Sequence, residues 1–375
     1  MLILFIHLVL VFFIYQALSP IHFTPLGLFF LELLSKVLYI PTWVLFVLDV
    51  GNLFLLWLIS RKIFREYSLL VPLIYAISPW SSYLVVAASF HIYLLFLLLI
   101  GCYGLLIIKT RKILGTFFVS GSIIGLTYSS LPLSLLLPLI LLIPIFKIVS
   151  ISYLKYAFVA VVILLLPLFF MIFGNYVGYK NILNNEVKVL SDPGLLNMVN
   201  DYQGIAQQRG LGSLAKISEN KYLFSFEKIL LKYLKQLTLA NYFTSQEKLL
   251  NFSFTPPIFL GFLIPFIYGL LQLLKQHKRI FFLSTFLVMP SVFSRYLVDL
   301  NRLIIFFPVV IVIISYGLIE LIKQKKKKTM RILLYLTLFL IVFQSMVTLF
   351  DISIREKDRF TKYYEFEKNY EVGKQ

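Results

Sequence analysis

Hydrophobic and polar residues occur along this chain in long blocks. Runs such as 157–173 and 303–319 contain no charged residue and, with their flanks, are long enough to cross about 30 Å of hydrocarbon. Because only helices and closed barrels satisfy their own backbone in lipid, these blocks predict an all-α integral membrane protein with about 11 transmembrane helices. The spans are expected at about 2–18, 43–59, 68–77 with a break at 78–80, a fourth ending near 108, 115–130, 131–146, 156–173, 257–274, 280–293, 303–322 and 332–350.

One large polar region separates two groups of apolar blocks. Residues 174–255 are rich in Asn, Lys, Gln and Ser, and within them 222–239 has helical periodicity, with apolar and Lys residues on opposite faces. We therefore expect an N-terminal transmembrane module at 1–173, a partly helical loop region of about 80 residues, and a C-terminal transmembrane module. The C-terminal module covers 256–350 and is followed by a polar tail at 351–375.

The stretch after the first apolar run is too short for two further spans. Its apolar residues, together with Glu32 and Lys36, predict a helix at about 24–40 that lies in the outer membrane interface. The first run itself, 2–18, lacks both a basic leader and a small-residue cleavage site. We expect it to be a retained anchor, with a cleaved signal peptide as the alternative.

Positive charge is concentrated in alternate connectors between the apolar blocks. These connectors hold 17 of the 35 Lys and Arg residues, against two acidic residues, Glu66 and Glu320. Loops rich in Lys and Arg stay on the cytoplasmic side, so the pattern predicts a plasma-membrane protein with a cytoplasmic N-terminus. The large loop region and the C-terminal tail would then be extracytoplasmic. The basic connectors are 61–65, 109–112, 147–155, 275–279 and 323–331.

Composition excludes several classes of protein. A chain that is 60% hydrophobic and 14% charged is too apolar for a soluble globular protein. The pI of about 9.7 does not indicate a nucleic-acid partner, because the cationic residues flank apolar helices. A single cysteine, Cys102, excludes an internal disulfide framework and a cysteine-based metal cluster. The expected partners are membrane lipids, and the sequence requires no cofactor.

Ionisable residues within spans are costly and are therefore the first candidates for function. Asp49 lies in the second predicted span, next to Gly51 and Asn52. It would serve either as a buried base or proton carrier, or as a structural carboxylate hydrogen-bonded to a neighbouring helix. His91 follows the break at 78–80 and would either contact substrate at the outer mouth or pack as a structural histidine.

The predicted outer loop between the ninth and tenth spans carries two arginines where the charge rule does not require them. Arg295, Asp299 and Arg302 lie within SRYLVDLNRLIIFFP. Guanidinium groups bind phosphate through paired hydrogen bonds, so a lipid-linked phosphate is one candidate ligand. An Arg–Asp pair that ties two helix ends together is the alternative. Arg209, in the large loop region, is a further candidate for substrate binding, with a solvated basic loop as its alternative.

The segment LLVPLIYAISPWSSYLVVAASFH contains a Ser-Pro-Trp break that ends an apolar run. The segment HFTPLGLFFLELLSKVL places His22, Pro25 and Leu26 before the expected interfacial helix. RGLGSLAKISENK lies in the large loop region, and a late apolar run begins with Arg302. In their order these four segments resemble the bacterial polytopic glycosyltransferases of the GT-C fold, which include protein O-mannosyltransferases and aminoarabinose-transferase-like enzymes. Together the resemblance covers about 22–321.

The resemblance implies transfer of a sugar from a polyprenyl-phosphate donor to an acceptor at the outer leaflet. In that family a carboxylate of the first outer loop, usually in an acidic pair, acts as base or metal ligand, so a divalent metal is possible. This chain lacks the pair and has Glu32 as the only carboxylate of that loop. Glu32 and Asp49 are therefore the candidate catalytic residues, and Arg302 and Arg295 would lie near the phosphate.

Three functional hypotheses follow. The first is a GT-C-type membrane glycosyltransferase that uses a lipid-phosphate sugar. The second is a relative without catalytic activity that binds lipid-linked glycan or a partner, and the missing acidic pair favours it. The third is a transporter of a lipid-linked substrate, which the absence of paired broken helices and of a two-half repeat disfavours.

Overall fold

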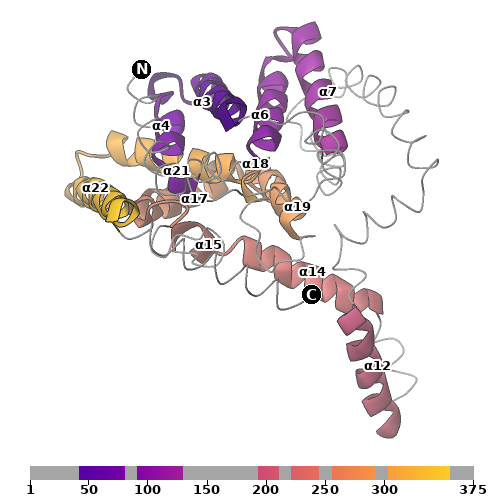
Figure 1. Cartoon of the computed structure of the whole chain (residues 1–375). Helices are drawn as coiled ribbons and strands as arrows, with labels where there is room; N and C mark the ends of the chain where they lie inside the picture. Colours follow the sequence, from indigo (N-terminus) through magenta and orange to yellow (C-terminus); the bar gives the residue numbers. More distant parts are fainter. Residues whose placement is uncertain are drawn as a thin grey trace.

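Figure 1 shows the computed structural model of the chain, which describes residues 42–80, 91–129, 193–210, 221–244, 256–292 and 303–354. Within these ranges every regular element is a helix, which confirms the all-α class. The α-helices are α3 (Thr42–Phe64), α4 (Leu70–Ile77), α6 (His91–Ile107), α7 (Lys112–Ser129), α12 (Pro193–Gln208), α14 (Lys221–Gln236), α15 (Ala240–Phe243), α17 (Leu263–Gln276), α18 (Lys278–Thr285), α19 (Met289–Val292), α21 (Phe307–Lys323) and α22 (Lys328–Ile354). Short 3₁₀ turns are η1 (Arg65–Tyr67), η2 (Leu260–Phe262) and η3 (Phe286–Val288).

Most predicted helices that fall within the described residues are present. The apolar blocks of the second, fourth, fifth, tenth and eleventh predicted spans form α3, α6, α7, α21 and α22, and the amphipathic segment predicted at 222–239 forms α14. The block at 280–293 is instead divided among α18, η3 and α19. The predicted first, sixth and seventh spans and the interfacial helix at 24–40 lie outside the described residues.

Helix α22 has the properties of a membrane span. Among the described residues it contains the one stretch, Lys328–Val347, that is both long and apolar enough to cross a bilayer by length and composition. Its side chains are largely exposed, including Phe339, Phe343 and Met346. The shorter apolar helical stretches are Ile92–Ile107, Lys112–Ile123 and Leu260–Gln276.

The predicted break at 78–80 is present, and its cause is local. The residue before a proline is disfavoured in helical conformation, and Ser78, which precedes Pro79, is extended with ψ 125°. Helix α4 therefore ends at Ile77. Two groups at the break form hydrogen bonds with a residue far along the chain. Ser78 Oγ donates to the carbonyl oxygen of Pro257 at 2.8 Å, and the backbone nitrogen of Trp80 donates to the same oxygen at 3.2 Å.

Glycines allow several helices to approach more closely than side chains would permit. A Cβ on Gly317 of α21 would overlap the carbonyl oxygen of Pro265 in α17, and one on Gly269 would lie 2.8 Å from the amide nitrogen of Gly317. In the α6–α7 hairpin, a Cβ on Gly104 would lie 3.0 Å from the carbonyl oxygen of Gly115. Small residues at helix crossings, combined with exposed apolar side chains elsewhere, are typical of helices that pack within lipid.

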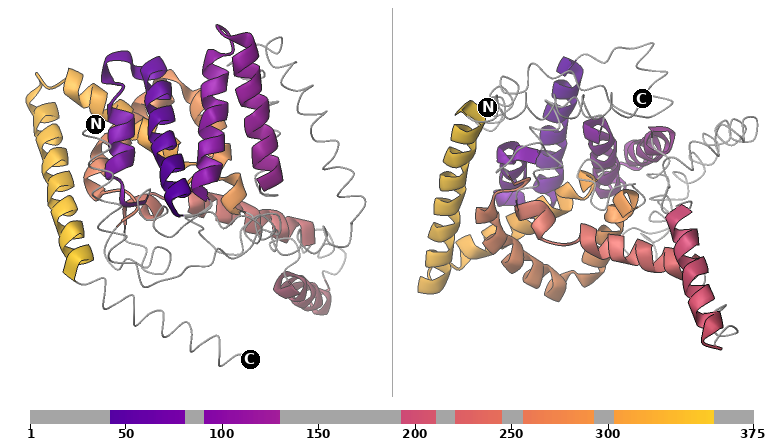
Figure 2. Two further views of the ribbon diagram at one scale, coloured as in Figure 1. Left: turned by 45° about the horizontal axis from the view of Figure 1, so that its top comes forward. Right: turned by 60° about the horizontal axis from the view of Figure 1, so that its bottom comes forward.

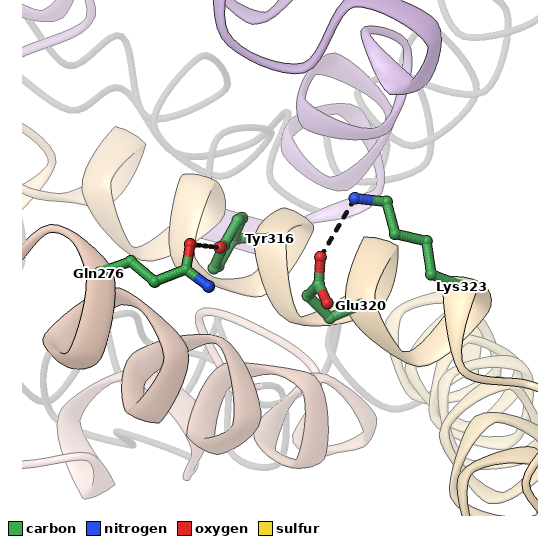
Figure 3. A network of polar contacts seen from close by, with 4 residues as sticks. All are labelled: Gln276, Tyr316, Glu320 and Lys323. Atoms are coloured by element: carbon green, nitrogen blue, oxygen red, sulfur yellow. Dashed lines mark hydrogen bonds and ion pairs between the residues drawn. The ribbon is translucent and has the colours of Figure 1, made fainter.

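The basic connectors of the described bundle lie at one end of it. In the left view of Figure 2, the α3–α4 and α6–α7 connections and the start of α22 are at the top, whereas α14 runs crosswise at the bottom. Polar contacts cap this basic end: Tyr316 donates to Gln276 Oε1 at 2.7 Å, and Lys323 pairs with Glu320 at 3.2 Å (Figure 3).

We predict that Gly317→Ala lowers the midpoint of thermal unfolding of the purified protein in detergent. The new methyl group would force α17 and α21 apart, and overpacking of this kind costs about 1–3 kcal/mol. Gly121→Ala in α7 is the matched control, because a Cβ there meets nothing within 4 Å. This control should be neutral or stabilising by up to about 1 kcal/mol, the helix propensity gained. Equal effects of the two substitutions would contradict the close crossing.

Candidate functional site

A polar pair lies inside the bundle where α3 meets α4. Asp49 of α3 is fully buried, and the Tyr75 hydroxyl of α4 donates a hydrogen bond to its Oδ1. Tyr75 is fully buried as well. An acceptor removed from water needs such a donor, because desolvation without a hydrogen bond costs several kcal/mol. The contact therefore holds α4 against α3 at one register.

Asn52 extends this pair toward α6. It lies three residues after Asp49 and so shares a helix face with it. Its Nδ2 donates to the carbonyl oxygen of Ile92 at 3.4 Å, while its Oδ1 has no hydrogen-bond partner among the described residues. Gly51 allows the approach of α6, because a Cβ there would lie 2.8 Å from the Phe96 ring.

Aromatic rings fix the position of Tyr75 and connect it to the C-terminal half of the chain. The Tyr75 and Phe307 rings have centroids 5.7 Å apart, and Trp80 lies 4.6 Å from Phe307 and 6.2 Å from Tyr242 by the same measure. The Trp80 side chain is fully buried, and its Nε1 has no hydrogen-bond partner among the described residues. The site is thus enclosed by α3, α4, α6, α15 and α21.

Tyr242, in the short helix α15, joins this cluster to the polar loop region. Its hydroxyl donates to the carbonyl oxygen of Gln236 at 2.8 Å, and its own carbonyl accepts from Ile258 N at 2.8 Å. Burial raises the pKa of the Tyr242 phenol well above its ordinary value, so it stays protonated at neutral pH and acts as a donor. The chain on either side of α15 is thereby held against the 78–80 break.

Of the residues that the sequence singled out, Asp49 is the one that the structure places in a polar cluster within the described part of the chain. Arg209 is exposed just beyond the end of α12, where the chain turns at Gly210 with φ 73°. His91 is the first residue of α6. The remaining candidates lie outside the described residues: His22, Glu32, Arg295, Asp299 and Arg302.

Three residues of the cluster were not singled out as site candidates from the sequence: Tyr75, Trp80 and Asn52. Tyr75 lies in an apolar helix without any pattern of its own, and it pairs with Asp49 only because α4 packs antiparallel to α3. Asn52 gave a weak signal, since it stands one helical turn from Asp49 in an otherwise apolar stretch.

The cluster does not fit a divalent metal ion. Asp49 is its one carboxylate, and Tyr75 and Asn52 supply a phenol and an amide. Among the described residues, no three His, Cys, Asp or Glu side chains lie close enough together to bind a metal. Magnesium and calcium sites need several oxygen ligands.

No model of a known protein family matches this chain, and no curated protein is similar to it in sequence.

We predict that Tyr75→Phe destabilises the protein by about 1–3 kcal/mol, because it removes a donor from a buried acceptor. Thermal or denaturant unfolding of the purified protein measures this. Tyr103→Phe in α6 is the matched control: the Tyr103 ring contacts Phe118 at 6.2 Å between centroids, and the phenol is half-buried. When Asp49→Asn is combined with Tyr75→Phe, the two effects should not add, since the residues share one contact. Additive effects would show that the hydrogen bond contributes nothing.

Proposed function

We propose that this chain is a multi-pass membrane protein with about 11 spans and a cytoplasmic N-terminus. Four observations support this proposal: the exposed apolar surface of α22, the glycine crossings between α17 and α21 and between α6 and α7, and the grouping of basic connectors at one end of the bundle. Because positive loops stay inside, that end is cytoplasmic and α14 lies at the outer end.

This topology predicts opposite labelling of two introduced cysteines. In a Cys102→Ser background, Gln207→Cys in α12 should react with a membrane-impermeant maleimide on intact cells. Lys326→Cys, in the connector between α21 and α22, should react only after permeabilisation. Both positions are exposed, so a difference reports the side of the membrane rather than burial. Reaction of Lys326→Cys on intact cells would contradict the orientation.

The proposed activity is that of a GT-C-type glycosyltransferase, which moves a sugar from a polyprenyl-phosphate donor to an acceptor at the outer face. The observation that carries it is the buried Asp49–Tyr75 pair directly beneath the 78–80 break. Asp49 precedes Arg61, at the basic end of α3, by about 18 Å of helix, and so lies in the outer half of the bundle. A carboxylate inside apolar helices is costly and is by default a functional candidate.

In the proposed reaction Asp49 is the general base. The acceptor hydroxyl oxygen attacks the anomeric carbon, the bond from that carbon to the phosphate oxygen breaks, and polyprenyl phosphate leaves with the electron pair. The acceptor proton passes to the Asp49 carboxylate, which Tyr75 orients through its hydrogen bond. Arg302 and Arg295 would stabilise the charge that develops on the leaving phosphate. Glu32 is the alternative base.

Full burial of Asp49 favours a second candidate function, binding without catalysis. With its carboxylate held by Tyr75 and shielded from water, Asp49 would then only join α3 to α4. The protein would bind a lipid-linked glycan or a partner through its outer face. The two candidate functions differ in whether the wild-type protein transfers sugar. They also differ in whether loss of the Asp49 carboxylate lowers a reaction rate.

A transfer assay with polyprenyl-phosphate sugars separates the two candidates. If Asp49 is the base, Asp49→Asn should lower the rate by about 10²–10⁴-fold, the usual contribution of general-base catalysis. Glu32→Gln tests the alternative base. Glu320→Gln is the matched control, because it makes the same carboxylate-to-amide change at the opposite end of the bundle. Absence of turnover by the wild-type protein with every donor tested would favour the binding function, and an unaffected Asp49→Asn variant would exclude Asp49 as the base.

A further inference from the structure

Helix α14 presents its apolar side away from the rest of the protein. Leu223, Phe226, Leu230 and Leu234 follow one another at spacings of three and four residues, and so form one stripe along the helix. All four are exposed; the exposed fractions of Phe226 and Leu234 are 64% and 55%.

The opposite side of α14 is polar and faces the protein. Ser225, Lys232 and Gln236 are buried, with exposed fractions of 5%, 6% and 0%. A surface helix of a water-soluble protein shows the reverse arrangement, with its apolar stripe on the core. The helix is also held firmly in this orientation, since α12 and α19 pack against it and the Tyr202 and Phe224 rings stack with centroids 5.7 Å apart. The outward apolar stripe therefore needs an apolar surrounding outside the protein.

The placement of α14 matches a membrane surface. Figure 2 shows it running crosswise to α3 and α6 at the end of the bundle opposite the basic connectors. A helix that lies in the plane of a membrane takes this direction, whereas a spanning helix runs parallel to the bundle. Apolar side chains are also exposed on α7 and α22, such as Phe117 and Met346, as helices that face lipid require.

The lysines of α14 lie away from its apolar stripe. The helix carries four lysines, Lys221, Lys228, Lys232 and Lys235, against one acidic residue, Glu227. By the helical repeat all four lie on the polar side, opposite the stripe. The stripe can therefore enter the acyl boundary of a membrane without burying a lysine charge.

We propose that α14 is a membrane-surface helix, whose Leu223–Leu234 stripe enters the outer leaflet. This inference rests on the proposed membrane location of the protein and does not depend on its catalytic activity.

Site-directed spin labelling of the full-length protein in vesicles tests this proposal. In a Cys102→Ser background, a nitroxide on Leu230→Cys should collide more often with oxygen, which concentrates in hydrocarbon, than with a water-soluble nickel chelate. Gln207→Cys in α12 is the aqueous control and should show the opposite order. Phe339→Cys in α22, where the native side chain is 65% exposed, is the control within the bilayer.

The outcomes separate the two proposals. If the Leu230 label favours the nickel chelate while the Phe339 label favours oxygen, the surface helix is wrong and the membrane location stands. If both favour the chelate, the membrane location itself is wrong. Low collision with both reagents at Leu230 would show that a second copy or another protein covers the stripe, which also overturns the proposal.

Discussion

The carbonyl oxygen of Pro257 holds the two halves of the described structure together. It accepts hydrogen bonds from Ser78 Oγ and Trp80 N at the point where α4 ends. Proline 79 forces that end, because Ser78 cannot continue the helix before it. With α4 ending there, Tyr75 lies one turn from its terminus, opposite Asp49, and Trp80 enters the aromatic cluster with Phe307. A change at the break would therefore disturb both the junction and the buried carboxylate.

Which helix faces pack together within the bundle depends more on the shape of the helix surfaces than on a difference in polarity between the faces. The helices carry apolar residues on nearly every side, so burial alone does not determine which faces meet. Glycines provide that information, since Gly269 and Gly317 let the α17 and α21 backbones touch, and Gly104 and Gly115 do the same in the α6–α7 hairpin. The few polar contacts, such as Asp49–Tyr75, then fix the register of helices that would otherwise slide.

The sequence predicted what depends on local pattern. Apolar blocks gave the positions of α3, α6, α7, α21 and α22, and the proline gave the break after Ile77. It did not predict that Tyr75 would donate to Asp49, because that contact needs α3 and α4 to pack antiparallel at one register. It also missed that α14 turns its polar side inward: periodicity shows that a helix has two faces, but not which one meets the protein.

The depth of Asp49 constrains the proposed chemistry. Seven residues separate it from Thr42, the first residue of α3, which is about 10 Å of helix. If α14 marks the outer membrane surface, Asp49 lies below that surface. The Asp49 carboxylate can accept a proton only if the acceptor hydroxyl and the sugar–phosphate bond reach this depth, next to the helix break. At the break, Ser78 and Trp80 are themselves buried and donate to the carbonyl oxygen of Pro257, so access to Asp49 from there requires these contacts to open. Glu32, in the predicted interfacial stretch, faces no such constraint of depth, and for that reason it remains the competing base.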